Sequence, residues 1–152
     1  MQGRFRLAAL STALVACATA TRLYEGPPRA PSEVVHVSIR PAAADRLSLN
    51  GVTVRGYSFE LEPGPIAVEF EMRRSGYGEM ATLGVYGAVC RAAFEGKAGM
   101  RYRIDGGQRR GETDAHVPKG EKRTVYESQL VIVGWIEEVG TGHRIEANCE
   151  AF

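Results

Sequence analysis

The sequence from Leu61 to Arg73, LEPGPIAVEFEMR, decides the fold class. Every second position from 66 to 72 is apolar, and the positions between them include Glu69 and Glu71. Successive side chains of a β-strand point to opposite faces of its sheet, so this pattern predicts a strand with one buried and one solvated face. Pro63-Gly64 predicts the turn before it, because proline presets φ and glycine supplies the positive φ of a type II turn.

The same two-residue period extends along the chain on both sides of this strand. Asn50-Gly51 lies within an alternating segment from 47 to 54 and predicts a hairpin with a type I′ turn. Further strands are expected over residues 35–39, 57–61, 80–95, 100–104 and 125–136.

The most apolar of these segments is Leu130–Ile136, LVIVGWI. Its β-branched residues and glycine disfavour a helix, and its composition predicts a central strand buried on both faces or a strand between two sheets. Thr141-Gly142 then predicts a turn into a last strand that places Ile145, Ala147 and Cys149 on one face.

Seven or eight short strands separated by turn signals, with no strong helical pattern, indicate an all-β protein. The expected architecture is a single antiparallel β-sandwich over residues 34–152, and a small up-and-down β-barrel is the alternative.

The N-terminus carries a processing signal. Arg4 and Arg6 precede an apolar run from Leu7 to Ala16, which is only about half of the roughly 20 residues that a transmembrane helix needs. The sequence therefore predicts a signal peptide. Ordinary secretion, with cleavage after Ala18 or Ala20, and a buried apolar helix are the alternatives.

The tetrapeptide Leu14-Val15-Ala16-Cys17 resembles the lipobox of bacterial lipoproteins. This resemblance implies removal of residues 1–16, acylation of the Cys17 thiol with fatty acids such as palmitate, and a lipid anchor in the membrane. Ala18 follows the cysteine where lipoproteins of the inner membrane commonly carry Asp, which implies an outer-membrane lipoprotein facing the periplasm.

Residues 17–33 are expected to form a lipidated tether. Pro27, Pro28 and Pro31 forbid a helix and favour extended backbone. At about 3.1 to 3.5 Å per residue, this segment could hold the domain up to roughly 50 Å from the lipid.

Cys90 and Cys149 remain once Cys17 is assigned to lipid. An even pair in an oxidising compartment predicts a disulfide, and two buried free thiols are the alternative. The cysteines and histidines lack the spacing of metal ligands, so neither a metal nor a cofactor is expected.

Three segments in order carry a family resemblance: Leu23–Val35, with LYEGP and later Pro31; Leu61–Gly64 before an alternating strand; and Ala98–Ile104, AGMRYRI. They resemble uncharacterised lipoproteins of Gram-negative bacteria. The middle of the chain is similar to PEGA-type surface domains, small β-sandwiches in which a Pro-Gly turn leads into a strand that displays a binding surface. The resemblance implies an envelope protein and transfers no catalytic residue.

One polar connection, Asp105–Arg123, is long enough to suggest a role. If it binds a ligand, its basic side chains suit carboxylate or phosphate groups; a solvated hairpin tip is the alternative. The candidate binding residues are Arg109, Arg110, His116, Lys122 and Arg123.

Glu69 and Glu71 are interpreted as a solvated strand face and not as a catalytic acid pair. Motifs for a serine nucleophile, a zinc protease or a phosphate loop are absent from the sequence. Lys and Arg number 19 against 18 Asp and Glu, a balance that gives no case for binding nucleic acid.

The function expected from the sequence is that of a non-enzymatic binding or structural module in the periplasm, which contacts another envelope protein or peptidoglycan. A small envelope hydrolase or enzyme inhibitor with a site built from loops is the alternative.

Overall fold

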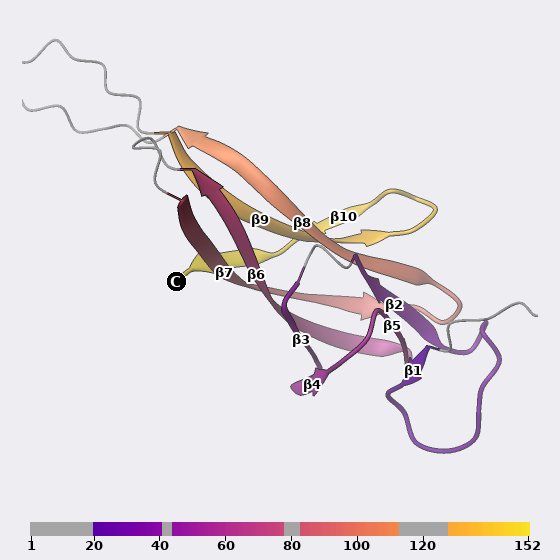
Figure 1. Cartoon of the computed structure of the whole chain (residues 1–152). Coiled ribbons are helices and arrows are strands. Elements are labelled where there is room, and N and C mark those ends of the chain that lie inside the picture. Colours follow the sequence, from indigo (N-terminus) through magenta and orange to yellow (C-terminus); the bar gives the residue numbers. More distant parts are fainter. Residues whose placement is uncertain (1–19, 41–43, 78–82, 113–127) are drawn as a thin grey trace, which may run out of the picture.

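A computed structural model describes residues 20–40, 44–77, 83–112 and 128–152, which form eleven strands and no helix. The strands make two sheets that pack into a β-sandwich (Figure 1). In sheet A the order is β1 (Thr21–Arg22), β5 (Ser58–Leu61), β2 (Val35–Ile39), β8 (Arg101–Glu112), β9 (Ser128–Glu138) and β10 (Arg144–Glu146). In sheet B the order is β11 (Asn148–Ala151), β7 (Leu83–Gly96), β6 (Gly64–Tyr77), β3 (Arg46–Leu49) and β4 (Val52–Val54).

The predicted sandwich is confirmed, and the alternative of a barrel is wrong, because the described strands form two sheets with free edges. The pairing is not wholly antiparallel. β2 pairs parallel with β8, and β1 pairs parallel with β5. Sheet A is therefore a mixed sheet, whereas all pairs in sheet B are antiparallel.

The local signals of the sequence match the described strands and turns. Asn50 and Gly51 have φ angles of 50° and 80°, as a type I′ turn between β3 and β4 requires. Gly64 has a positive φ of 132° directly after Pro63, so the predicted turn leads into β6. Along β6, the inward apolar residues are fully buried: Ile66, Val68, Phe70 and Met72.

The segment predicted as a tether contacts the domain from Thr21 onward, so the domain begins before the expected boundary at residue 34. Thr21 and Arg22 already pair with β5, and Leu23 packs against the core. The proline-rich part is held by His36 of β2, whose Nε2 lies 3.1 Å from the carbonyl oxygen of Pro31. The periodicity of the sequence does not record these contacts, because their partners lie far along the chain.

Glycine in β8 and β9 lets the two sheets meet closely. Gly106 and Gly134 are directly opposite each other in register. An added Cβ at Gly134 would lie 2.6 Å from Cζ of Phe70 and 3.1 Å from Sγ of Cys90, and one at Gly106 would overlap Met72. Side chains of sheet B thus fill a hollow that two glycines leave in the inner face of sheet A.

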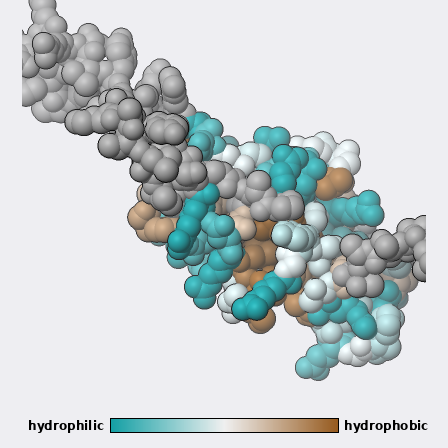
Figure 2. Space-filling model, viewed as in Figure 1, coloured by the Kyte–Doolittle hydropathy of each residue, from teal (hydrophilic) through white to brown (hydrophobic). Residues whose placement is uncertain are grey.

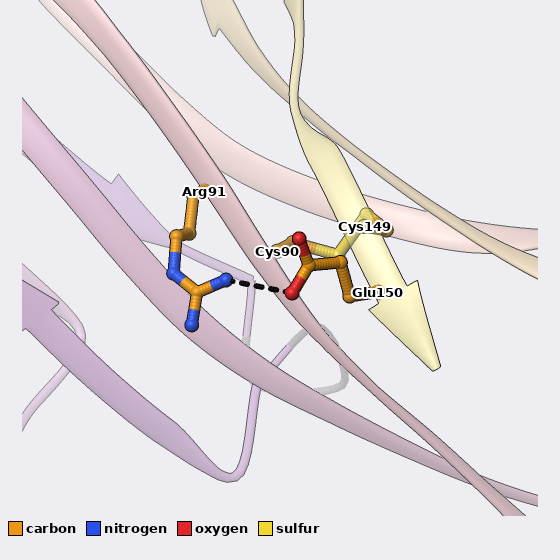
Figure 3. The surroundings of a disulfide bond; sticks show 4 residues. All are labelled: Cys90, Arg91, Cys149 and Glu150. Atoms are coloured by element: carbon orange, nitrogen blue, oxygen red, sulfur yellow. Dashed lines mark hydrogen bonds and ion pairs between the residues drawn. A yellow bond between two sulfur atoms is a disulfide. The ribbon is translucent and has the colours of Figure 1, made fainter. Parts of the chain in front are cut away.

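A disulfide joins Cys90 of β7 to Cys149 of β11, with the Sγ atoms 2.04 Å apart (Figure 3). The predicted pairing agrees with this geometry, and the two residues are partners in the strand register. The neighbouring residues Arg91 and Glu150 form an ion pair of 3.1 Å on the outer face of the sheet. The single last strand that the sequence predicts is in fact two, because β10 belongs to sheet A and β11 to sheet B.

The apolar strand β9 is not buried on both faces, which corrects one of the two expectations for it. Ile132 and Ile136 point into the core, whereas Val131 is exposed and Trp135 is partly exposed. β9 also contacts β7 and β11, so the alternative expectation of a strand between two sheets describes it better.

The surface is mostly hydrophilic in the view of Figure 2, with hydrophobic residues visible mainly near the middle of the domain. This distribution agrees with the alternation of the strands, whose outward positions carry most of the charged residues.

We predict that Gly134→Ala destabilises the domain, because the added methyl group meets the rigid ring of Phe70 and the disulfide. Overpacking of this kind lowers the free energy of unfolding by about 1–3 kcal/mol. A guanidinium titration with the disulfide intact measures this loss. The matched control is Gly107→Ala, where the nearest atom to the new Cβ is a Trp135 ring carbon at 3.8 Å, an ordinary contact. Equal stability of the two variants would contradict the packing described.

Candidate functional site

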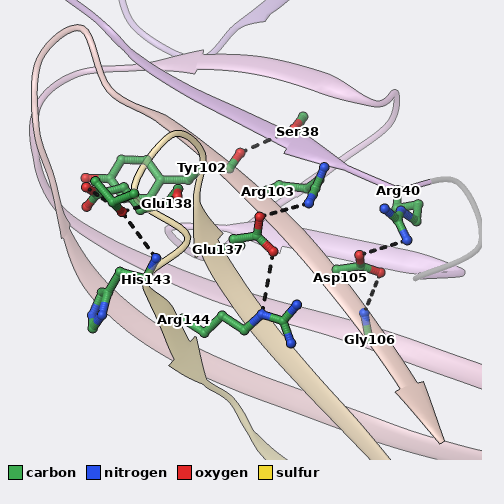
Figure 4. Close-up of polar contacts among 11 residues, drawn as sticks. Ser38, Arg40, Tyr102, Arg103, Asp105, Gly106, Glu137, Glu138, His143 and Arg144 are labelled. Atoms are coloured by element: carbon green, nitrogen blue, oxygen red, sulfur yellow. Dashed lines mark hydrogen bonds and ion pairs between the residues drawn. The ribbon is translucent and has the colours of Figure 1, made fainter.

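The outer face of sheet A gathers the polar chemistry of the fold. Strands β2, β8, β9 and β10 lie side by side here, and their inward residues are buried apolar groups such as Ile104 and Ile136. Their outward residues form an array that combines two groups of ion pairs (Figure 4) with the ring of Trp135. We call this array the sheet A face; it comprises Arg40, Arg103, Asp105, Trp135, Glu137 and Arg144.

Glu137 lies at the centre of this array, between two arginines. Its Oε1 accepts from Nη2 of Arg103 at 2.9 Å, and its Oε2 lies 3.6 Å from Nε of Arg144. Both arginines are its partners in the strand register, one on β8 and one on β10. Cross-strand pairs of opposite charge stabilise a sheet and fix the positions of the side chains involved.

Asp105 is the most buried charged residue among those described, at 5% exposure. Its Oδ1 accepts from the backbone N–H of Gly106 at 2.8 Å, and its Oδ2 lies 3.2 Å from Nη1 of Arg40. The carboxylate is therefore satisfied inside the sheet A face, as a buried charge must be. It holds the end of β2 against β8.

Trp135 supplies the aromatic surface of the site. Cζ of Arg144 lies 4.7 Å from the ring centroid, a cation–π contact. The far edge of the indole lies over Gly107 of β8, which leaves room for it by having no side chain. Within the described part of the chain, the buried Nε1 of Trp135 and Nε of Arg103 have no hydrogen-bond partner.

A groove of about 400 Å³ runs beside this tryptophan, where β9 meets β10 and β11. Arg109 and Arg144 lie on it together with Val131 and Val133, so it offers cationic and apolar contacts at once. The remaining lining residues are Ile132, Gly134, Trp135, Glu146, Ala147, Asn148 and Cys149. An acceptor group such as a carboxylate or a peptide carbonyl suits the guanidinium groups of these arginines.

The outer face of sheet B carries a larger hollow, of about 740 Å³. Two of its charged groups are engaged with each other: Glu69 bonds Nε of Arg91 at 2.8 Å, and Glu150, beside the hollow, bonds the same guanidinium. These bonds, the one to Glu69 first, raise the pKa of Arg91 above its usual value. No aromatic residue lies among those that line this hollow, so we favour the smaller groove as the candidate site.

The structure corrects the predicted binding loop in its first part. Residues 105–112 belong to strand β8 and pair with β9, so the connection begins after Glu112. Arg109 lines the groove, and Arg110 pairs with Leu130 in the register. Cys17, His116, Lys122 and Arg123 lie outside the described residues.

The sequence does not identify four residues of the sheet A face as functional: Arg103, Trp135, Glu137 and Arg144. The apolar stretch around Trp135 predicts burial, although Trp135 directly precedes the buried Ile136 and must therefore point to the opposite face of the strand. That alternation is the signal that could have placed it on the surface. The arginines and the glutamate carry no motif, because their proximity is created by pairing between strands.

Comparison with known proteins finds no matching family, no matching curated protein and no matching solved structure. Over the described ranges, the chain has no helix long and apolar enough to cross a membrane. Nor do these ranges group three or more His, Cys, Asp or Glu side chains in a way that could hold a metal ion.

Proposed function

We propose that this protein is a lipoprotein of the bacterial cell envelope, anchored through Cys17, whose β-sandwich binds another envelope protein without performing catalysis. The observation that carries the proposal is the groove in which Trp135, Arg144 and Arg109 lie together on an open sheet face. Tryptophan and arginine dominate the binding energy of protein interfaces, because each offers a large contact area together with hydrogen-bond donors.

The ion pairs around the groove support a binding role. Glu137 is paired with Arg103 and Asp105 with Arg40, so these side chains are already positioned before any partner arrives. A preorganised surface loses little conformational freedom on association, which leaves more of the contact energy for affinity. The remaining cation at the groove, Arg109, is exposed and suits a carboxylate of the partner.

The anchor rests on the order of Arg4, Arg6, the apolar run and Cys17 in the sequence. The disulfide between Cys90 and Cys149 agrees with export, because such bonds persist in the oxidising periplasm. We place the protein in the outer membrane, facing the periplasm, on the basis of Ala18 and the lipobox resemblance.

We predict that Cys17→Ser moves the protein from the membrane fraction to the soluble fraction and abolishes labelling by a fatty-acid analogue. The sulfur of Cys17 is the atom to which the lipid is attached, and serine has no sulfur. The double variant Cys90→Ser/Cys149→Ser is the control and keeps the label, because it retains Cys17. Labelling that persists in Cys17→Ser would overturn the anchor.

We predict that a photoreactive p-benzoylphenylalanine at position 131, in the groove, captures a discrete protein partner in cells. The control places the same residue at position 93, which is exposed in the hollow of sheet B. Adding Trp135→Ala should abolish the capture at 131. Capture at position 93 alone, or equal capture at both positions, would contradict the groove as the binding site. Capture of a peptidoglycan fragment at position 131 would show that the partner is peptidoglycan and not a protein.

A further inference from the structure

The short distance between Cys17 and strand β1 limits where the domain can lie, if Cys17 is lipidated as the proposed function states. Thr21, the first residue of β1, follows Cys17 by only four residues. An extended chain covers at most about 3.5 Å per residue, so this connection spans no more than about 14 Å. The edge of sheet A at β1 must therefore stay near the lipid headgroups.

The attachment at β1 is firm, so the domain cannot swing away on a long tether. Leu23 donates its backbone N–H to the carbonyl of Glu60 at 2.9 Å, and Tyr24 Oη donates to the carboxylate of Glu60 at 3.4 Å. Further along, Arg29 forms an ion pair with Glu62. Glu33 accepts from the backbone of Ala30 at 2.8 Å and closes this segment on itself. Because the segment from Thr21 onward is attached to the domain, only the residues before Thr21 separate sheet A from the anchor.

The surface beside the anchor point is the turn from Arg55 to Tyr57. A Cβ on Gly56 would lie 3.7 Å from Oγ1 of Thr21, so this turn lies directly against β1. Tyr57 is 64% exposed, which makes it one of the most exposed large apolar residues described. Val52, at the start of strand β4, which precedes this turn in the chain, is exposed as well. β1, β4 and β5 lie along the same side of the domain in Figure 1.

The charged residues at this edge are compatible with a phospholipid surface. Arg55 directly precedes Gly56, and Arg22 is the second residue of β1. Both are exposed, and so is Glu25. Arginine binds phosphate through its planar fork of donors. Tyrosine prefers the level of the headgroups, where its ring lies in an apolar layer and its hydroxyl stays hydrated. The exposed ring of Tyr57 is therefore the side chain of this edge that best suits the headgroup layer.

We propose that the turn Arg55–Tyr57, together with Arg22 and Val52, rests on the phospholipid surface and fixes the orientation of the anchored domain. Tyr57 enters the headgroup layer and the two arginines contact lipid phosphates. β10 is the opposite edge of sheet A from β1. The groove at Trp135 is consequently held away from the bilayer, where a partner can reach it.

The test uses the acylated full-length protein, reconstituted in vesicles of phosphatidylethanolamine and phosphatidylglycerol with brominated acyl chains. Trp135 is the single tryptophan of the chain, so Trp135→Phe provides a silent background. Tyr57→Trp then reports on the proposed surface. Phe152→Trp is the matched control, because Phe152 is 65% exposed and follows β11, at the edge of sheet B opposite β4.

We expect bromine quenching and a blue shift of the emission for Tyr57→Trp, and neither effect for Phe152→Trp. Adding Cys17→Ser should remove the quenching. If the Tyr57→Trp variant floats with the vesicles but its emission stays unquenched, the proposed surface is wrong and the anchor still holds. Equal quenching at positions 57 and 152 would lead to the same conclusion. Failure of the acylated protein to float would overturn the anchor instead.

Discussion

The contact between Phe70 and the backbone at Gly134 is the constraint on which the rest of the structure depends. A side chain at position 134 would occupy the space that the phenyl ring and the Cys90–Cys149 disulfide now fill. Protein interiors are packed as densely as organic crystals, so this space cannot be shared. The glycine lets β9 of sheet A approach β6 and β7 of sheet B, and the disulfide then ties β11 to the same place.

The same strand carries this constraint from the core to the surface. Position 134 faces the core, so the side chain of Trp135 must point to the outer face. There it lies over Gly107 of β8 and beneath the guanidinium of Arg144. Glu137 follows at the next outward position and fixes Arg103 and Arg144 by ion pairs. The groove at Trp135 therefore owes its position to packing on the other side of the sheet. At the far edge of sheet A, the docked N-terminal segment would place this groove away from a lipid anchor.

Sequence reasoning succeeds here where structure is set locally. The alternation in β6 and the Asn50-Gly51 turn are decided by neighbouring residues, and both are found as predicted. It fails where a partner lies far along the chain. The composition of residues 17–33 predicts a tether, because the hydrogen bond from Leu23 to Glu60 leaves no pattern in the sequence of the segment itself. The sequence predicts a loop over residues 105–112, because their polar side chains give no sign of the pairing with β9. Gly106 and Gly134 are likewise ordinary glycines until the register sets them opposite each other.

A double-mutant cycle at Gly134 and Phe70 tests this account most directly. Phe70→Leu shortens the side chain that fills the glycine hollow, so it should leave room for the methyl group of Gly134→Ala. The account predicts that the double variant loses less unfolding free energy than the two single variants lose together. The difference should be about 1 kcal/mol or more. Additivity within about 0.5 kcal/mol would contradict it, because independent sites behave in that way.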